Sequence, residues 1–291
     1  MKILVTGGAG FIGKNMVKTL KEKHEVVVFD QSEGCDVLDR EQLLEATRGC
    51  DAVFHLAAFL GVRNTEENPL KTLDVNIIGV RNVLDACVKN DVKRVVFSSS
   101  SEVYGNPEKT PVAESDRLAP VSVYGYTKII GENYVKAYAA EYGLKYAIVR
   151  YFSVYGPGQR TDFVLPKMVH RAVRGEPLEI YGSGEQVRAF THVKDIVNGT
   201  ILAFEKGSND VFNIGNPGEP VTMNQLAARV LKITGSSSQV RHVPFEKSDR
   251  SEAREIFKRI PDIIKARRML GYVPVKSLDD GISDVMRNEN L

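Results

Sequence analysis

Val5-Thr6-Gly7-Gly8-Ala9-Gly10-Phe11-Ile12-Gly13 is the stretch of this 291-residue chain that decides its fold. The apolar residues just before it, Ile3 to Val5, predict a buried parallel strand. Phe11 to Leu20 then changes to the spacing of an amphipathic helix. The glycines therefore form a tight turn that joins a buried strand to a helix.

This turn has the properties of a phosphate-binding loop. Gly7, Gly10 and Gly13 lack side chains, so backbone N–H groups and the positive end of the helix can approach a pyrophosphate. A second strand, Glu25 to Phe29, ends in Asp30 at about the 20-residue distance typical of dinucleotide sites. A carboxylate there accepts hydrogen bonds from the adenosine ribose and repels a 2′-phosphate. The sequence therefore predicts a dinucleotide site that prefers NAD to NADP.

Composition excludes several other classes of protein. Lys and Arg number 39 against 37 Asp and Glu, so no basic field indicates a nucleic-acid partner. We find no apolar run of membrane-spanning length and no signal-peptide pattern, so we expect a cytoplasmic protein without a membrane partner. Three cysteines, far apart in the chain, predict reduced thiols. The cysteines and five scattered histidines predict no metal site.

Small and polar residues follow the next two predicted strands. Asp51 to Leu56 runs into Ala57 and Ala58, and Lys93 to Ser99 runs into a serine stretch that ends at Gly105. The carboxyl ends of parallel strands lie at one edge of a sheet, where open α/β sheets bind ligands. We therefore expect both segments to border the site. Asn76, within a predicted helix from Pro69 to Lys89, is by itself equally compatible with an exposed polar residue.

Tyr124 and Lys128 lie four residues apart in a predicted helix from Val121 to Tyr142. This spacing places both side chains on one helix face. A lysine ammonium near a phenol favours the phenolate, and we expect it to lower the pKa of Tyr124. The pair then predicts a general base that works near neutral pH.

Regular alternation of strands and helices loosens after the predicted strand from Tyr146 to Arg150. Residues 1–152 are predicted to form the dinucleotide-binding domain, and residues 153–291 mainly a substrate-binding lobe interleaved with it. Shorter elements are expected in the second part: strands near 178–181 and 211–214, and helices near 165–174, 194–205, 223–233, 261–270 and 277–286.

Taken together, these motifs resemble those of the extended short-chain dehydrogenases/reductases of the nucleotide-sugar epimerase/dehydratase family, which includes UDP-glucose 4-epimerase-like enzymes. The resemblance runs nearly end to end, through Thr6–Gly13, His55–Ala58, Ser98–Gly105, Tyr124-x-x-x-Lys128, Arg150–Phe152, Tyr155–Pro157, Tyr181–Arg188 and His192–Ile196. It implies an α/β fold: a Rossmann-type doubly wound parallel sheet with a smaller, interleaved C-terminal α/β lobe that binds the nucleotide sugar.

The resemblance also implies roles for individual residues. The residues implied to bind NAD are Gly7, Gly10, Phe11, Ile12, Gly13, Asp30, Asp36, Val37, Leu56, Ala57, Ala58, Asn76, Ser98, Tyr124, Lys128 and Phe152. Those implied to bind the substrate are Ser100, Ser153, Tyr181, Arg188 and Arg259, with Arg188 on the diphosphate and Tyr181 near the base. Arg254 is the alternative to Arg259. The implied catalytic residues are Ser100, Tyr124 and Lys128, together with Glu102 as a possible C5 base.

Family chemistry then implies the reaction. Tyr124 removes the proton of the sugar 4-hydroxyl while C4 passes a hydride to NAD, which yields a 4-keto sugar. We favour a UDP-sugar 4-epimerase, because Ser100 is serine and Ser101 replaces the aspartate usual in dehydratases. A 4,6-dehydratase or a UDP-glucuronate decarboxylase that uses Glu102 is the alternative; the Lys-Arg-x-Pro-Asp pattern at 258–262 resembles the decarboxylase branch. A non-catalytic NAD-binding regulator is a third reading.

The same resemblance implies a homodimer. Family members usually pack two helices from each subunit into a four-helix bundle. In this chain the two helices are those predicted at Pro69 to Lys89 and Val121 to Tyr142.

Overall fold

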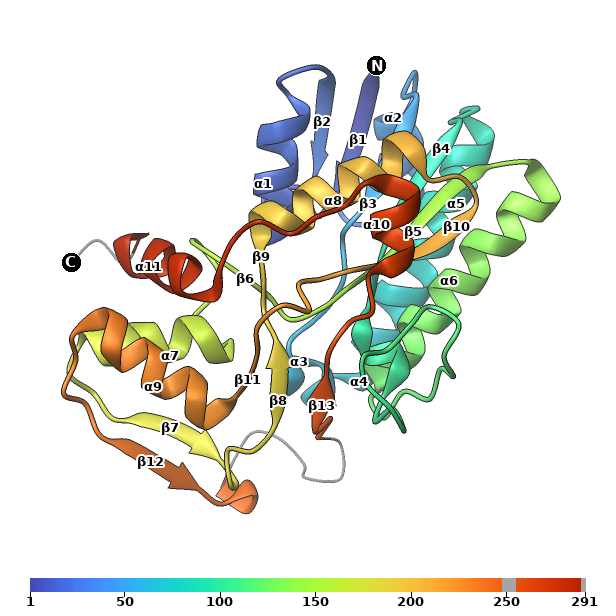
Figure 1. Cartoon of the computed structure of the whole chain (residues 1–291). Helices are drawn as coiled ribbons and strands as arrows, with labels where there is room; N and C mark the ends of the chain where they lie inside the picture. Colours follow the sequence, from blue (N-terminus) through green and yellow to red (C-terminus); the bar gives the residue numbers. More distant parts are fainter. Residues whose placement is uncertain (248–254, 289–291) are drawn as a thin grey trace.

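A six-stranded parallel sheet forms the centre of the large lobe in the computed structural model, which describes residues 1–247 and 255–288 (Figure 1). The strand order is β10-β5-β4-β3-β1-β2. The strands are β1 (Lys2–Thr6), β2 (Glu25–Phe29), β3 (Ala52–His55), β4 (Arg94–Ser100), β5 (Lys145–Tyr151) and β10 (Asp210–Ile214). This order confirms the doubly wound α/β fold.

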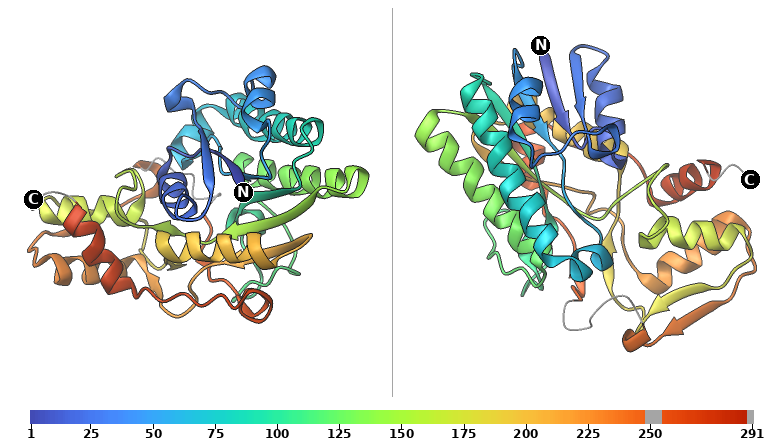
Figure 2. Two further views of the ribbon diagram at one scale, coloured as in Figure 1. Left: turned by 90° about the horizontal axis from the view of Figure 1, so that it is seen from above. Right: turned by 180° about the vertical axis from the view of Figure 1, so that it is seen from behind.

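Alternate side chains of the strands point to opposite faces, and helices cover both faces. Ile3 and Val5 pack with α1, α8 and α10, whereas Leu4 packs with α2, α5 and α6. The two helical layers appear in front of and behind the sheet in Figures 1 and 2. Their helices are α1 (Phe11–Leu20), α8 (Val193–Lys206) and α10 (Ile264–Leu270) on one face, and α2 (Arg40–Thr47), α5 (Gly79–Lys89) and α6 (Val123–Tyr142) on the other.

α6 begins two residues later than the sequence predicts. The side chain of Ser122 accepts a hydrogen bond from the Gly125 N–H at 3.1 Å and so caps the helix. At its other end Gly143 takes a left-handed conformation with φ of 71° and closes the last turn on Ala139. These two caps fix where the tyrosine and lysine of this helix stand relative to β4.

The helix predicted from Pro69 to Lys89 is interrupted. It consists of α4 (Pro69–Leu73), a π-helical turn η2 (Asp74–Ile78) and α5. The wider turn buries Asn76, whose side chain accepts a hydrogen bond from Phe59 N at 2.8 Å and donates one to Phe59 O at 3.0 Å. A further helix, α3 (Val62–Glu67), precedes it and was not predicted.

The C-terminal lobe is smaller and has its own apolar core. Its helices α7 (Val164–Val173), α9 (Met223–Thr234) and α11 (Leu278–Asn288) pack together beside short strands, as Figure 1 shows. These strands are β7 (Leu178–Tyr181), β8 (Val187–Ala189), β11 (Pro220–Thr222), β12 (Val240–Val243) and β13 (Lys258–Arg259). The remaining elements are β6 (Val154–Tyr155), β9 (Thr191–His192) and the 3₁₀ turns η1 (Gln31–Glu33), η3 (Ser101–Tyr104) and η4 (Phe245–Lys247).

Several segments after residue 152 return to the large lobe. β10 pairs with β5 as an edge strand of the main sheet, and α8 and α10 cover one face of that sheet. β13 pairs with β8 in the small lobe, and two residues later Pro261 bridges Val112 in the loop after η3. The chain therefore crosses between the lobes repeatedly beside the cavity described below.

Candidate active site

A cavity of about 580 Å³ lies at the carboxyl edge of the main sheet. The large lobe contributes the glycine turn after β1, the ends of β2, β3 and β4, and the start of α6. The small lobe contributes Phe190, Arg188 and Arg259. The motifs that the sequence placed at one sheet edge are thus gathered around one space.

The glycine turn is tightly folded against the neighbouring chain. Gly7 has φ of 71°, and a Cβ there would lie 2.7 Å from Ala57 N. A Cβ on Gly13 would lie 2.0 Å from Gly7 O. Side chains are therefore excluded at these two glycines on steric grounds, which leaves the backbone of the turn open to the cavity beside Phe11 and Ile12 at the start of α1.

Asp30 holds this turn from the end of β2. Its Oδ2 accepts a hydrogen bond from Ala9 N at 3.0 Å, and its Oδ1 accepts two from Ser32, at 3.0 Å from N and 2.8 Å from Oγ. Asp36 and Val37 line the same end of the cavity, and so do Leu56, Ala57 and Ala58. A glycine turn that leads into a helix N-terminus, with a carboxylate beside it, fits the pyrophosphate and adenosine ribose of a dinucleotide.

Three of the expected binding residues do not line this cavity. Asn76 is 3 % exposed and is bonded to the backbone of Phe59. Phe152 is fully buried and packs on Tyr104, with ring centroids 6.1 Å apart. Tyr181 borders a neighbouring cavity of about 80 Å³, which also reaches Arg188. In this structure Asn76 and Phe152 support the cavity wall from behind it.

Ser100, Tyr124 and Lys128 meet at the centre of the cavity. Ser100 ends β4, and its hydroxyl is hydrogen-bonded to the phenol of Tyr124. Lys128 Nζ lies 5.5 Å from the centroid of the Tyr124 ring and donates a hydrogen bond to the carbonyl of Ser98 at 2.8 Å. The helical spacing thus brings the pair onto the face of α6 that packs against β4.

The pKa of Tyr124 is raised, contrary to the expectation from its four-residue spacing to Lys128. Burial raises the pKa of Tyr124, and the nearby Glu102 carboxylate raises it further. The hydrogen bond with Ser100 and the charge of Arg259 act in the opposite direction but are outweighed. Lys128 is itself buried, which lowers its pKa to about 7 against the attraction of Glu132. Desolvation therefore dominates both groups.

Glu102 also lies in the cavity wall, within η3. Its carboxylate accepts a hydrogen bond from Ser122 Oγ at 2.8 Å and lies 3.8 Å from Arg259 Nη1. The Nε of Arg259 is buried and has no hydrogen-bond partner among residues 1–247 and 255–288. Arg254, the alternative arginine of the sequence analysis, lies outside the described residues. The Glu102 carboxylate and the Arg259 guanidinium therefore lie beside Tyr124, and the Nε of that guanidinium can still donate a hydrogen bond.

Arg188 points into the cavity from β8 and is ion-paired with Glu255. Both side chains are largely buried, at 10 % and 6 % exposure. Sequence reasoning missed Glu255, because the contact depends on the pairing of β8 with the segment around β13. It also missed Ser122, although a serine just before a helix is a recognisable cap signal. Ser153, with φ of 36°, lines the cavity as expected.

Other kinds of site are not found in the part of the chain that the structure describes. Residues 1–247 and 255–288 contain no group of three or more metal-ligating side chains. None of the helices described there is long and apolar enough to cross a membrane.

Comparison with known proteins identifies the family to which this chain belongs. The model of the NAD-dependent epimerase/dehydratase family matches residues 3–215. The chain belongs to this family. As a member it is an NAD-dependent enzyme, in agreement with the cofactor and fold predicted from the sequence.

Relatives in this epimerase/dehydratase family cover nearly the whole chain. The UDP-N-acetyl-alpha-D-glucosaminuronate decarboxylase of Bacillus cytotoxicus is 35% identical, over 98% of this chain and 97% of its own. The UDP-glucose 4-epimerase of Thermotoga maritima, solved with UDP-glucose, has a TM-score of 0.93 and 36% identity over 100% of this chain and 99% of its own. The UDP-glucuronic acid 4-epimerase of Bacillus cereus, solved with UDP-glucuronic acid and NAD, has a TM-score of 0.91 and 31% identity, over 100% of this chain and 99% of its own.

Proposed function

We propose that this enzyme is a UDP-sugar 4-epimerase that works through a transient 4-keto sugar. The observation that carries the proposal is the meeting of Ser100, Tyr124 and Lys128 in one cavity with the glycine turn. The 4-epimerases of Thermotoga maritima and Bacillus cereus, solved with UDP-sugars, support the choice of substrate class.

Tyr124 acts as the base in this proposal. Its phenolate takes the proton from the sugar 4-hydroxyl, and Ser100 hydrogen-bonds the same oxygen and so aligns it. NAD, when held by the glycine turn and Asp30, would supply the hydride acceptor and donor that this chemistry needs at C4. Return of the hydride to the opposite face of the 4-keto sugar gives the epimer, while Tyr124 gives its proton back to the oxygen.

Lys128 supports Tyr124 in two ways. Its ammonium group, 5.5 Å from the centroid of the Tyr124 ring, stabilises the phenolate, and it would also be a donor to the ribose of a bound cofactor. Burial keeps water away from both groups, which strengthens their mutual attraction. In this proposal the charge of Lys128 favours the phenolate and acts against burial, which raises the pKa of Tyr124.

Arg188 and Arg259 bind the diphosphate on the far wall of the cavity. A guanidinium suits a phosphate because its planar fork can donate two parallel hydrogen bonds. Arg259 has a free Nε among the described residues, and Arg188 is oriented by Glu255. We assign residues 153–291 mainly to this substrate-binding task, and Tyr181 in the adjoining cavity to the base.

Decarboxylation is the second candidate, and the pair of Glu102 with Arg259 favours it. A 4-keto intermediate with a carboxylate at C5 can lose carbon dioxide, and Arg259 is a cation suited to hold such a carboxylate. Glu102 can then handle the proton at C5. The Bacillus cytotoxicus decarboxylase supports this alternative at 35% identity. In the 4-epimerase reading, Glu102 instead anchors Ser122 and Arg259.

Proton NMR of the enzyme with NAD in deuterated water tests these readings against one another. The substrates are UDP-glucose, UDP-galactose, UDP-glucuronate and UDP-N-acetylglucosaminuronate. A 4-epimer without deuterium at C5 supports the 4-epimerase. A pentose product overturns it in favour of decarboxylation, and a 4-keto-6-deoxy product overturns it in favour of a 4,6-dehydratase. Deuterium at C5 overturns it in favour of a reaction that uses Glu102 at C5. No conversion of any UDP-, dTDP-, GDP- or CDP-sugar would indicate a non-catalytic NAD-binding regulator.

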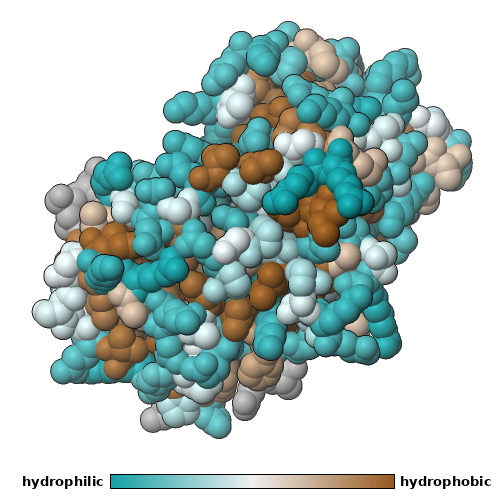
Figure 3. Space-filling view, in the orientation of Figure 1, coloured by the Kyte–Doolittle hydropathy of each residue, from teal (hydrophilic) through white to brown (hydrophobic). Residues whose placement is uncertain are grey.

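We further propose that the enzyme is a cytoplasmic homodimer. Apolar side chains are exposed along α4, η2 and α6: Leu70, Leu73, Ile78, Tyr126 and Ile130. These helices lie on the side seen from behind in Figure 2. Figure 3 draws the opposite side, where several hydrophobic groups lie among hydrophilic residues. An exposed apolar helix face marks an interaction surface.

Light scattering at micromolar concentration tests the dimer. We expect twice the chain mass for the wild type and the chain mass for Ile78→Glu. Val275→Glu, which alters an equally apolar residue that is 80% exposed on the other lobe, is the matched control and should stay dimeric. A wild-type protein of single-chain mass would contradict the proposal.

A further inference from the structure

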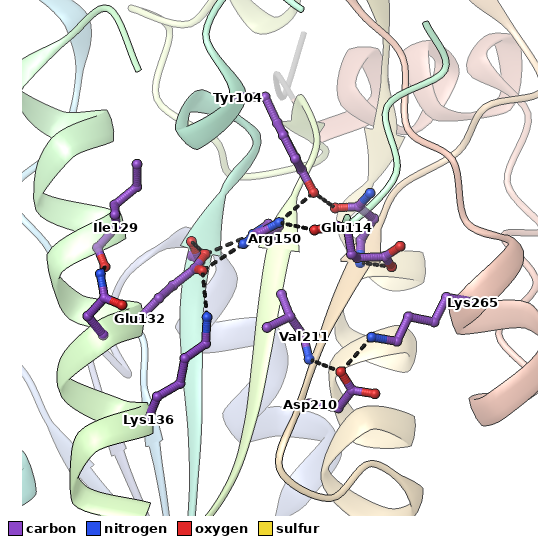
Figure 4. Close-up of polar contacts among 12 residues, drawn as sticks. Tyr104, Glu114, Ile129, Glu132, Lys136, Arg150, Asp210, Val211 and Lys265 are labelled. Atoms are coloured by element: carbon purple, nitrogen blue, oxygen red, sulfur yellow. Dashed lines mark hydrogen bonds and ion pairs between the residues drawn. The ribbon is translucent and has the colours of Figure 1, made fainter. Parts of the chain in front are cut away.

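Glu132 is a buried carboxylate outside the cavity. It lies on α6 one helical turn after Lys128, and its side chain is 1 % exposed. Arg150 of β5 donates two hydrogen bonds to this carboxylate, 2.8 Å from Nε to Oε1 and 2.7 Å from Nη2 to Oε2 (Figure 4). Ser99 Oγ donates a third at 2.6 Å. A carboxylate held by three donors has a fixed position.

Arg150 in turn joins this carboxylate to distant parts of the chain. Its Nη1 donates to Tyr104 Oη at 2.7 Å and to the Glu114 carbonyl at 3.2 Å. Tyr104 Oη donates to Asn213 Oδ1 at 2.7 Å. Figure 4 shows Arg150 between Glu132 and Tyr104. These hydrogen bonds link α6, η3 and β10. Glu132 and Arg150 do not line the cavity, so they can act on the reaction only through other residues.

We propose that Glu132, clamped by Arg150, is a positioning residue that keeps Lys128 in its ammonium form and thereby sets the alkaline limit of the reaction. This proposal rests on the proposed function, in which the charge of Lys128 supports the base Tyr124. It requires that Glu132 be the principal counter-charge of Lys128, and the surroundings of that lysine meet the requirement.

The groups that face Lys128 come from three elements. α6 contributes Tyr124 and Glu132, β4 contributes the Ser98 carbonyl and the Phe97 ring, and β3 contributes His55. Burial and the charge of Lys128 lower the pKa of His55 to about 3, so His55 is neutral and offers no anion. In the described part of the chain, Glu132 is the charge that raises the pKa of Lys128 against burial.

Two cations lie on the other side of Glu132. Arg150 of β5 is 3 % exposed, and Lys136 of α6 is 42 % exposed with its Nζ 3.9 Å from Glu132 Oε2. The fork of Arg150 fixes both carboxylate oxygens, so the carboxylate cannot turn outward to Lys136 and the solvent. The clamp therefore keeps a negative charge one turn from Lys128 within an apolar interior, where charge interactions are strong.

The first measurement is the pH dependence of kcat and of kcat/KM. Glu132→Gln removes the charge, and the double variant Glu132→Gln/Arg150→Gln removes it without leaving an unpaired buried cation. In Glu132→Gln we expect the alkaline limb to move to lower pH by about one unit, a tenfold change in the deprotonation constant. In the double variant it should move in the same direction by less, because the positive charge of Arg150 is removed as well. Glu141→Gln, an exposed carboxamide substitution on the same helix, should leave the limb in place.

The second measurement follows Lys128 directly in the protein without cofactor. The Nζ signals of lysines labelled with ¹³C and ¹⁵N are titrated by NMR, and the Lys128 signal is assigned from its loss in Lys128→Met. Its titration midpoint should fall by about one unit in Glu132→Gln, fall by less in the double variant, and stay constant in Glu141→Gln. If Glu132→Gln does not yield folded protein, the charge-neutral double variant supports the same comparison.

Two results would overturn the inference. Variants that lose kcat while the alkaline limb and the Lys128 midpoint stay unchanged would give Glu132 a structural role only. Variants whose kcat, alkaline limb and Lys128 midpoint all match the wild type would show that Glu132 has no role in the reaction. Because the titration needs neither cofactor nor substrate, a shifted Lys128 midpoint in a protein that converts no sugar would contradict the proposed function and leave the electrostatic inference standing.

Discussion

The sheet edge and the C-terminal lobe contribute to the same cavity in different ways. At the sheet edge each contribution is a contiguous motif: the turn at 7–13, the serines at 98–101, and the pair four residues apart on α6. In the C-terminal lobe, Arg188 and Arg259 come from β8 and β13, which are distant in sequence and pair over two residues. Local geometry therefore places the first set, whereas tertiary pairing places the second.

This difference predicts which substitutions affect which step. Side chains of the sheet edge are held by helix caps and buried hydrogen bonds next to the reacting atoms. Those of the lobe are held by ion pairs such as Arg188 with Glu255. Changes at the edge should therefore lower kcat or the stability of the fold, and changes in the lobe should mainly raise KM.

The largest expected effect is at Tyr124. Tyr124→Phe keeps the ring and removes the base, so kcat should fall about 10²- to 10⁴-fold with little change in stability. The measurement is conversion of a UDP-sugar followed by NMR. Tyr126→Phe, at a 55 % exposed position on the same helix, is the control and should retain wild-type turnover. Full turnover by Tyr124→Phe would contradict the mechanism.

Glu132 should show the largest effect on stability. Glu132→Gln leaves Arg150 buried at 3 % exposure without its counter-charge, which we expect to lower the free energy of unfolding by about 3–5 kcal/mol. Replacing both partners with apolar residues, as in Glu132→Leu/Arg150→Met, should cost less because no charge stays uncompensated. Urea unfolding measures both. A double variant less stable than Glu132→Gln would show that the ion pair itself stabilises the fold.

Much of the sheet edge was predictable because its signals have fixed spacing. A glycine turn between strand and helix, a carboxylate after the next strand, and a pair four residues apart each determine local geometry wherever the fold occurs. The structure accordingly places Gly7, Asp30, Ser100, Tyr124 and Lys128 around one cavity. Periodicity also located the helices of both lobes to within a few residues.

The remaining features depend on tertiary structure. The π-helical turn η2 directs Asn76 toward the backbone of Phe59, and periodicity does not reveal such a turn. The raised pKa of Tyr124 depends on burial, which a four-residue spacing does not report. The Arg188–Glu255 ion pair requires strands of two or three residues to meet, and such strands are too short for a period-two pattern.

In the lobe, Arg188 tests whether tertiary pairing governs binding. Arg188→Lys keeps the charge but loses the planar fork, so the KM for the UDP-sugar should rise about tenfold to a hundredfold while kcat changes less. Steady-state kinetics with varied UDP-sugar gives both parameters. Arg241→Lys, at an exposed position of β12, is the control. A fall in kcat at constant KM would place Arg188 with the reacting groups and weaken the contrast between the two regions.

The smallest expected effect compares one histidine from each region by pH. His55 of β3 is 2 % exposed, its Nδ1 lies 2.7 Å from Thr6 Oγ1, and burial lowers its pKa to about 3. A histidine whose pKa is depressed on folding is neutral in the native state, whereas the unfolded chain takes up a proton below about pH 6.5. Its contribution to stability is therefore complete above that pH and is lost progressively as the pH falls toward 3.

At pH 5 this loss should reach about 2 kcal/mol, because the unfolded chain is favoured by 1.4 kcal/mol for each pH unit below its own pKa. His55→Asn can retain a hydrogen bond to Thr6 but cannot titrate, so its free energy of unfolding should fall less between pH 7 and 5. His242→Asn, at an exposed position of the C-terminal lobe, is measured over the same pH range for comparison. If the free energy of unfolding falls equally with pH in the wild type and in His55→Asn, burial at the sheet edge does not control the pKa of this histidine. The two regions would then differ less in their electrostatics than in their geometry.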